Sequence, residues 1–448
     1  MSRDNGTSRR RDVLKGLGTA SILALAGCTG GDGGDGDDVS GGDGGTATMT
    51  ETMTETMTET ETTTAGGDGG RTIKLGIVMG VTGGLSELGP PIRNAGQLTA
   101  RYLNDQSDQF TIDANFADTG TDPNTGISQA NSLVSQGYPM INGALSSTVS
   151  IQMAENVTVP NEIVQCSPAS TSPAITDLND NDYIWRTPPT DALQGQVMAT
   201  VAVDRLDAST TATLALNNDY GQLLAQEYVN AFEDGGGTVQ AQVSFEKTQS
   251  SYSARLNEAL SGAPDVLMIV GYPESGVQIF RDFYSDYSQD FADILVPDGL
   301  KAGSLPGDVG NSMRNVWGTA PLSSGPGIDM FESMYEEEFG SKPGTPFMGQ
   351  SFDSSAVLCL ANAAAGENSG SAIRDQIVAV ANPGGETVTI ENLPEGLQMA
   401  ANGTQIQYKG ASSAVDFDEN GDMKAVTYEL YRYNESGVER VNTIEFSK

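Results

Sequence analysis

Residues 73–89 read IKLGIVMGVTGGLSELG, and this stretch decides the fold. Its first seven residues, 73–79, are mostly apolar and have the length of a buried β-strand. A glycine-rich turn at 80–84 follows, and apolar side chains then recur near helical spacing at Ala95, Leu98, Tyr102 and Leu103. A strand, a turn and a helix in this order form the repeating unit of a parallel α/β sheet.

The same unit recurs along the chain. A second strand is predicted around 110–116, and the helix after it should begin at Pro123, capped by Asp122, and run to Gly137. Further strands are predicted at 139–142, 163–166, 212–216, 266–270 and 294–296. This alternation predicts an α/β fold with helices on both faces of a parallel sheet.

The N-terminus has the features of an export signal. Arg10 and Arg11 lie in SRRRDVLK, close to the twin-arginine signal. The apolar run at 13–27 is shorter than the roughly 20 residues of a membrane-spanning helix, so we expect 1–27 to be a signal peptide. It ends in Leu-Ala-Gly before Cys28, which matches the lipobox of bacterial and archaeal lipoproteins. We therefore predict lipidation of Cys28; the alternative is an ordinary cleavage site with a chance cysteine.

Residues 28–70 consist largely of Gly, Asp and Thr and include a repeated Met-Thr-Glu-Thr unit. They have no apolar face at any period, so we predict a disordered linker and expect the folded part to begin near Arg71.

The chain has 59 acidic and 23 basic residues and no histidine, for a net charge of -36. Nucleic acid and anionic membrane surfaces are poor partners for so negative a surface, and the acidic excess suggests a halophilic, haloarchaeal-type proteome. The absence of histidine excludes every catalytic triad and metal site that needs imidazole. Without histidine, an exported hydrolase would need a serine nucleophile with a lysine as its base, and we find no lysine in a position that suggests this role. We expect no enzyme activity, no metal and no cofactor.

Two cysteines remain if Cys28 is lipidated. Cys166 and Cys359 each lie in an apolar stretch, which predicts buried free thiols, with a disulfide between them as the alternative.

Three N-x-Ser/Thr sequons allow N-glycosylation on an exported chain, at Asn156, Asn402 and Asn434.

Serine- and threonine-rich loops follow two predicted strands, at 143–148 and 167–172. Ligands of parallel sheets bind beyond the carboxyl ends of the strands, where backbone N–H groups and hydroxyls can bind an anion such as a carboxylate. The alternative is that these side chains only cap helices.

Residues 416–422 begin like a calcium loop, but position twelve is Thr427 instead of glutamate, so we predict a hairpin turned by Asn420 and Gly421.

Taken together, the chain after Arg71 resembles the type I periplasmic solute-binding proteins of ABC importers, in the leucine/isoleucine/valine-binding branch. The motifs that carry this resemblance are the opening stretch and DTGTDPNTGISQANSLVSQG at 118, INGALSST at 141, CSPASTSP at 166, YIWRTPPTDALQGQ at 183, NNDYGQ at 217, DVLMIVGYPESG at 265, VPDG at 296 and FDENGDMK at 417.

The resemblance implies two Rossmann-like lobes that close as a hinge around three connecting strands. The crossovers then fall near Pro188, Trp317 and Ser412. Lobe 1 would comprise 71–188 and 318–412, and lobe 2 would comprise 189–317 and 413–448.

The resemblance also implies a site for an α-amino acid. The family's carboxylate-binding positions match Ser147, Ser170 and Thr171, and its ammonium-binding carboxylate matches Asp298. Tyr220 and Tyr272 match the aromatic residues that close over the ligand, while Leu88 stands where the first lobe has an aromatic residue. Ser146 replaces one cysteine of the family's disulfide. The alternatives are structural roles for the two tyrosines and a capping role for Asp298.

The implied function is an extracytoplasmic, lipid-anchored and monomeric binding protein of an ABC importer. It would capture a branched-chain or other apolar amino acid and deliver it to the permease and ATPase. The alternative is a surface sensor for an amide, urea or another small solute.

Overall fold

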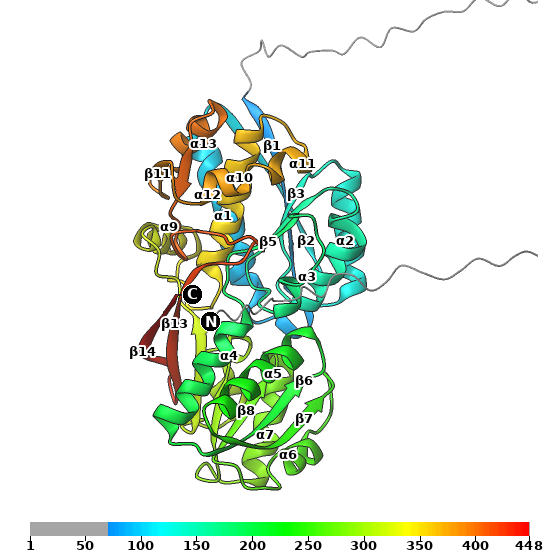
Figure 1. Cartoon of the computed structure of the whole chain (residues 1–448), viewed down its shortest axis with the longest axis vertical. Helices are drawn as coiled ribbons and strands as arrows, with labels where there is room; N and C mark the ends of the chain where they lie inside the picture. The colour runs from blue at the N-terminus through cyan, green and yellow to red at the C-terminus, as the bar shows by residue number, and fades with distance from the viewer. Residues whose placement is uncertain (1–69, 448) are drawn as a thin grey trace, which may run out of the picture. The chain divides into compact units, whose positions relative to one another are not determined.

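The computed structural model describes residues 70–447, so the predictions for Arg10, Arg11, Cys28 and the linker lie outside it. The described part contains two lobes, each built on one sheet (Figure 1). The first sheet has five parallel strands in the order β2-β1-β3-β4-β5. Their bounds are β1 (Arg71–Met79), β2 (Phe110–Asp118), β3 (Met140–Gly143), β4 (Val164–Ser167) and β5 (Ile184–Arg186).

The second sheet has seven strands in the order β14-β13-β10-β9-β8-β6-β7, and only the pairs made by β13 are antiparallel. Their bounds are β6 (Thr210–Leu216), β7 (Thr238–Phe245), β8 (Val266–Val270), β9 (Asp293–Val296), β10 (Val316–Pro321), β13 (Ala425–Asn434) and β14 (Gly437–Ser447). The predicted α/β class with two lobes is confirmed.

Helices cover both sheets (Figure 1). The first lobe contains α1 (Gly89–Gln106), α2 (Pro123–Ser135), α3 (Ser147–Met153), α9 (Ile328–Phe339), α10 (Met348–Ala365), α11 (Gly370–Arg374), α12 (Ile377–Ala381) and α13 (Leu393–Ala401), with the short strands β11 (Glu386–Val388) and β12 (Ile406–Tyr408). The second contains α4 (Asp191–Thr200), α5 (Asp219–Asp234), α6 (Ser253–Ala259), α7 (Pro273–Asp286) and α8 (Leu305–Val309).

Local chemistry explains the first two strand-helix units. The last five residues of β1 are buried, as a central strand covered on both faces requires. Ala95, Leu98 and Leu103 form the buried side of α1. The Asp122 side chain accepts a hydrogen bond of 2.9 Å from Thr125 N and Pro123 is the first residue of α2, which confirms the predicted cap.

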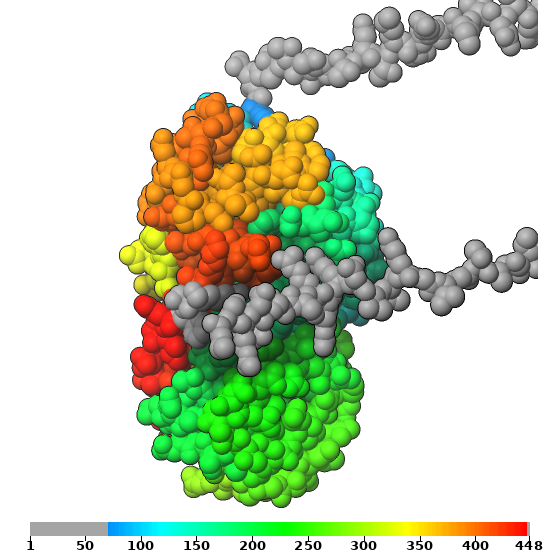
Figure 2. Space-filling model, viewed as in Figure 1, coloured from blue at the N-terminus to red at the C-terminus, as the bar shows by residue number. Residues whose placement is uncertain are grey.

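Three segments connect the lobes, at 187–190, 322–327 and 409–424. The second and third segments bond to each other, because Ser324 N donates to Ser412 O at 3.0 Å, and the second also bonds to the second sheet, because Leu322 N donates to Thr427 O at 2.8 Å. β10 stays in the second sheet to Pro321, so the second crossover begins after that residue and not at Trp317. In the space-filling view, the orange-red chain around the third segment lies at the surface between the lobes (Figure 2).

Other predictions concern single residues. Cys166 and Cys359 are buried and free, as predicted. Asn420 and Gly421 lie in a tight turn closed by an antiparallel bridge between Phe417 and Met423. Within residues 70–447, no helix is long and apolar enough to cross a membrane, and no cluster of three or more acidic or cysteine side chains is arranged to hold a metal ion.

Gly89, which ends the stretch that decides the fold, gives a test of the first unit. A Cβ atom on Gly89 would lie 1.9 Å from the carbonyl oxygen of Gly80. We therefore expect Gly89→Ala to lower the free energy of unfolding by about 2 kcal/mol or more, although alanine favours helices. Gly307→Ala is the control, because no atom lies within 4 Å of the added methyl group. Denaturant unfolding in concentrated salt measures both; equal stability of the two variants contradicts the tight approach of α1 to the turn.

Candidate ligand-binding site

The carboxyl ends of parallel strands from both sheets face a small cavity. Ser147 follows β3, Ala169 follows β4, Tyr220 follows β6, Tyr272 follows β8, and Asp298 follows β9. The cavity holds about 20 Å³, which is room for one water molecule. A ligand of the size of an amino acid can therefore enter only when the lobes separate.

Apolar side chains form most of the cavity wall. They come from the loop after β1, from α1, from the loop after β3 and from the start of α10: Leu85, Leu88, Ile92, Leu145 and Phe347. Phe347 has a left-handed backbone with φ 68°, an unfavourable conformation for an aromatic residue. An apolar wall with few polar groups is typical of small-molecule sites.

Asp298 is the charged residue of this wall, and its carboxylate is buried. Tyr220 donates a long hydrogen bond of 3.5 Å to its Oδ2. Oδ1 has no hydrogen-bond partner among the described residues. The side-chain amide of Gln194 lies nearby and lowers the pKa of Asp298, because it stabilises the charged carboxylate. Burial raises the pKa of Asp298 to about 6. The site thus holds a carboxylate whose charge is not neutralised at the cavity.

Tyr220 and Tyr272 stack on each other with ring centroids 5.6 Å apart and planes 1° from parallel. Gly299 N donates to the Tyr220 hydroxyl at 3.2 Å, and a Cβ on Gly299 would lie 2.7 Å from that oxygen, so glycine is needed there. Burial raises the pKa of both phenols, that of Tyr272 to about 12. Both rings therefore remain neutral and supply a polarisable wall and a hydroxyl donor.

Hydrogen bonds join the two lobes beside the cavity. The Tyr272 hydroxyl donates to Ser146 Oγ at 3.3 Å. The Ser172 hydroxyl donates to Asp219 O at 3.0 Å, and Asp219 N donates to Thr148 Oγ1 at 3.2 Å. The lobes are thus in contact at the helix starts that surround the site.

The predicted carboxylate-binding residues differ in their placement. Ser147 lines the cavity, and its Oγ accepts a hydrogen bond of 3.3 Å from Ser172 N. Ser170 does not line it, because its hydroxyl bonds Ser150 Oγ at 2.7 Å and reaches Ala144 O at 3.2 Å. Thr171 also lies outside the wall, and its buried Oγ1 lacks a partner within the described part of the chain. The structure therefore brings Ser147, Tyr220, Tyr272 and Asp298 together at the cavity.

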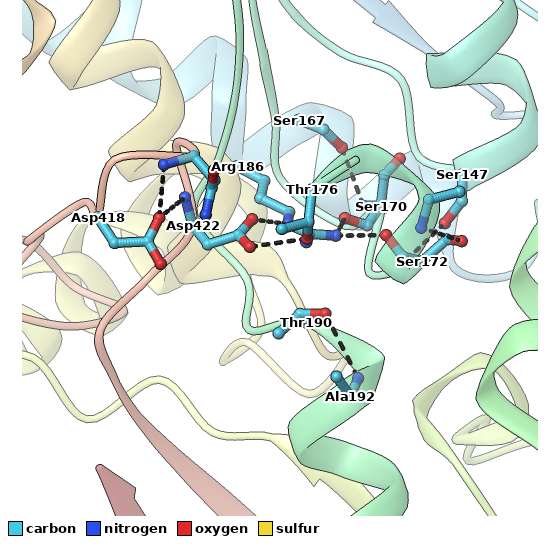
Figure 3. A network of polar contacts seen from close by, with 12 residues as sticks. Ser147, Ser167, Ser170, Ser172, Thr176, Arg186, Thr190, Ala192, Asp418 and Asp422 are labelled. Atoms are coloured by element: carbon cyan, nitrogen blue, oxygen red, sulfur yellow. Dashed lines mark hydrogen bonds and ion pairs between the residues drawn. The ribbon is translucent and has the colours of Figure 1, made fainter. Parts of the chain in front are cut away.

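Arg186 holds the loop that carries Ser170 and Ser172 (Figure 3). Its guanidinium is fully buried and forms an ion pair of 2.5 Å with Asp422 of the third crossover. It also donates to Ser172 O at 2.7 Å and to the hydroxyl of Thr176 at 2.6 Å. The Arg186 side chain thus connects the loop after β4 to the third crossover, which lies more than 200 residues away in the sequence.

A larger hollow of about 520 Å³ lies at the crossovers. Its wall contains residues of all three connecting segments, among them Pro189, Leu322 and Ser413. Among the described residues of this wall, exposed Glu445 is the one that can ionise. Because none of the described residues in its wall is a buried charged group, this hollow at the crossovers is less suited to bind a zwitterion than the smaller cavity.

Sequence reasoning missed several residues near the site. Asp191, at the start of α4, is fully buried, and burial together with the charge of Asp298 raises its pKa well above the usual range. Gln194 and Tyr428 are also buried beside the acids. The signal for Asp191 was present: an acidic residue directly after the helix cap Thr190, in a segment that leaves a strand of the sheet.

The chain is similar to known proteins in sequence and in fold. A family model described as periplasmic binding protein matches residues 72–416. The chain is 24% identical over 389 residues to Leu/Ile/Val-binding protein homolog 1 of Brucella abortus, covering 85% of this chain and 95% of that protein. It is 23% identical over 330 residues to the chemotactic signal transduction system substrate-binding protein BasB of Halobacterium salinarum, covering 72% and 76%.

The fold is also similar to a solved structure, that of the branched-chain amino acid transporter substrate-binding protein LivJ from Streptococcus pneumoniae in complex with isoleucine. The TM-score is 0.69 at 18% identity, over 84% of this chain and 100% of that one.

The two ion pairs of the turn at 416–424 give a matched test. Asp422→Asn leaves the buried guanidinium of Arg186 without its counter-charge, so we expect a loss of about 3–5 kcal/mol in the free energy of unfolding. Asp416→Asn breaks the partly exposed pair with Lys424 on the same turn and should cost less than about 1 kcal/mol. Denaturant unfolding compares them; similar losses in both variants contradict the structural role of Arg186.

Proposed function

Since this chain belongs to the periplasmic binding protein family, we propose that it captures a free amino acid with a branched or other apolar side chain between its lobes. The family consists of ligand-binding proteins rather than enzymes, so the chain is a binding protein. The observation that carries the proposal is Asp298, a buried carboxylate in an otherwise largely apolar cavity. Such a carboxylate suits the ammonium group of an α-amino acid.

The other groups of the ligand have complementary places. The ligand carboxylate would face Ser147 and the backbone of the first-lobe loop. An apolar side chain would contact Leu88, Ile92 and Phe347. Named relatives support this class of ligand, since one is a Leu/Ile/Val-binding homologue and another binds isoleucine.

The proposal extends to the setting of the protein. A signal peptide with Arg10 and Arg11 and a lipid on Cys28 would hold the binding domain at the outer face of the membrane, next to the permease and ATPase of an ABC importer. The tether would keep the monomeric domain at high local concentration near that partner.

Asp298 gives the direct test of ligand binding. Calorimetry in concentrated salt should show leucine, isoleucine or valine binding to the wild type. Asp298→Asn should weaken this binding by about 100-fold, because the ligand ammonium loses a buried charge-assisted partner. Asp290→Asn is the control, since it removes the same charge from an exposed position of the same lobe. Binding of none of these amino acids, or equal affinity of the two variants, contradicts the proposal.

A second function is favoured by the similarity to BasB, a chemotactic substrate-binding protein. In that case the closed lobes would dock a receptor instead of a permease. A deletion strain separates the two functions: an importer subunit predicts lost uptake of labelled leucine with intact chemotaxis, and a sensor predicts the reverse.

A further inference from the structure

Within residues 70–447, three sequons for N-linked glycosylation differ in how the fold presents them. Asn156 begins Asn-Val-Thr, Asn402 begins Asn-Gly-Thr and Asn434 begins Asn-Glu-Ser. The sugar is transferred to the side-chain amide of the asparagine, and the transferase also requires the hydroxyl two residues later. Both groups must therefore reach its active site. Threonine is the better of the two hydroxyl residues, so the sequence alone favours Asn156 and Asn402 over Asn434.

The sequon at Asn156 is closed off by the fold of the first lobe. It lies in the helical segment 154–158. Thr158 is fully buried, and its hydroxyl donates to Gln165 Oε1 at 2.8 Å. Val157, the middle residue of the sequon, is fully buried in the core of that lobe. A transferase can reach the threonine hydroxyl only if this segment leaves the core.

The sequon at Asn402 lies at the surface but is held at a helix end. Asn402 caps the carboxyl end of α13 and is exposed, whereas Thr404 is half-buried. The N–H of Gly403 donates to Ala400 O at 3.0 Å, and that of Thr404 donates to Met399 O at 2.9 Å. These bonds satisfy the last carbonyl groups of the helix. The sequon can enter an active site only after the helix end has opened.

The sequon at Asn434 forms the tip of the hairpin between β13 and β14 (Figure 1). Asn434 ends β13, and its sheet partner Gly437 begins β14. Glu435 and Ser436 between them are exposed. Ser436 N donates to Asn434 Oδ1 at 2.7 Å, so the two residues that the transferase reads lie in one turn. Asn434 Nδ2, the atom that would receive the sugar, donates a surface bond of 3.2 Å to Glu439 Oε2. Water can replace that bond without any change in the core.

A glycan at this tip would also protect an edge of the second sheet. β14 is an outermost strand of that sheet and has 11 residues. A long edge strand presents unpaired backbone groups with which another chain can pair. Val441 in this strand is 42% exposed. A bulky, hydrophilic group beside the first residue of β14 would keep other chains away from this edge.

We propose that Asn434 carries an N-linked glycan in the exported protein and that Asn156 carries none. The inference rests on the export named in the proposed function, because the twin-arginine route carries folded proteins. The transferase then meets a folded domain, and accessibility decides which sequon is modified. Asn434 is not part of the wall of the ligand cavity, so the modification leaves ligand binding unchanged.

The sugar donor would be an oligosaccharide joined to a membrane lipid through phosphate. The bond between the first sugar carbon and the phosphate oxygen breaks, and a bond between that carbon and Asn434 Nδ2 forms. The lipid phosphate leaves with the electron pair of the broken bond. The amide gives up one proton to a base of the transferase.

Mass spectrometry of peptides tests this on the full chain purified from the membranes of its native host. The peptide with Asn434 should carry the mass of an oligosaccharide in most molecules, the peptide with Asn402 in fewer, and the peptide with Asn156 in none. Ser436→Ala should abolish the modification of Asn434, because the transferase loses the hydroxyl. Ser436→Thr is the matched control and should keep the modification. Both variants should be exported like the wild type, since position 436 is exposed.

The outcomes separate this inference from the proposed export. A chain that stays in the cytoplasm with residues 1–27 attached overturns both. A processed chain at the membrane overturns this inference alone if Asn434 is free of sugar, if Asn156 carries sugar, or if Asn402 carries more than Asn434. Modification of Asn434 that persists in Ser436→Ala also overturns it.

Discussion

The buried guanidinium of Arg186 fixes the geometry on which the site depends. It neutralises Asp422 and binds the carbonyl oxygen of Ser172, so the loop after β4 and the third crossover form one unit. The carbonyl of that loop points toward Arg186, while Ser172 N is bonded to Ser147 Oγ at the cavity. Because β5 leads directly into the first crossover, the same side chain lies where the chain leaves the first lobe.

Charge is distributed differently inside the site and on the surface. The chain carries a large acidic excess, which is well solvated only on the outside. At the cavity, by contrast, Asp298 is buried and has no ion-pair partner among residues 70–447, where Arg186 pairs with Asp422 and Lys301 with Glu429. If the lobes close on a cationic group, that group pairs with the buried carboxylate. If they close without one, the carboxylate stays buried and unpaired, which costs free energy. This difference between the two closed forms is a physical reason for the lobes to close on the ligand.

Much of the fold follows from local patterns, and much of the site does not. The strand at 73–79, observed as β1 at 71–79, and the cap at Asp122 were predictable because a buried strand and a helix start each have a signature of a few residues. β7 was missed although Val239, Ala241, Val243 and Phe245 alternate as they should in an edge strand. The role of Asp422 was not predictable from its turn, because its partner lies 236 residues away. Ser170 matched the family pattern, yet its hydroxyl is engaged by Ser150 of α3 and by Ala144 O in the loop after β3.

The orientation of the ligand is the central claim, and a crystal structure grown with leucine in concentrated salt tests it most directly. The account predicts the leucine nitrogen within hydrogen-bond distance of the Asp298 carboxylate, its carboxylate at Ser147, and its side chain against Leu88 and Phe347. A leucine bound in the hollow at the crossovers, or one whose amino group faces away from Asp298, would contradict it.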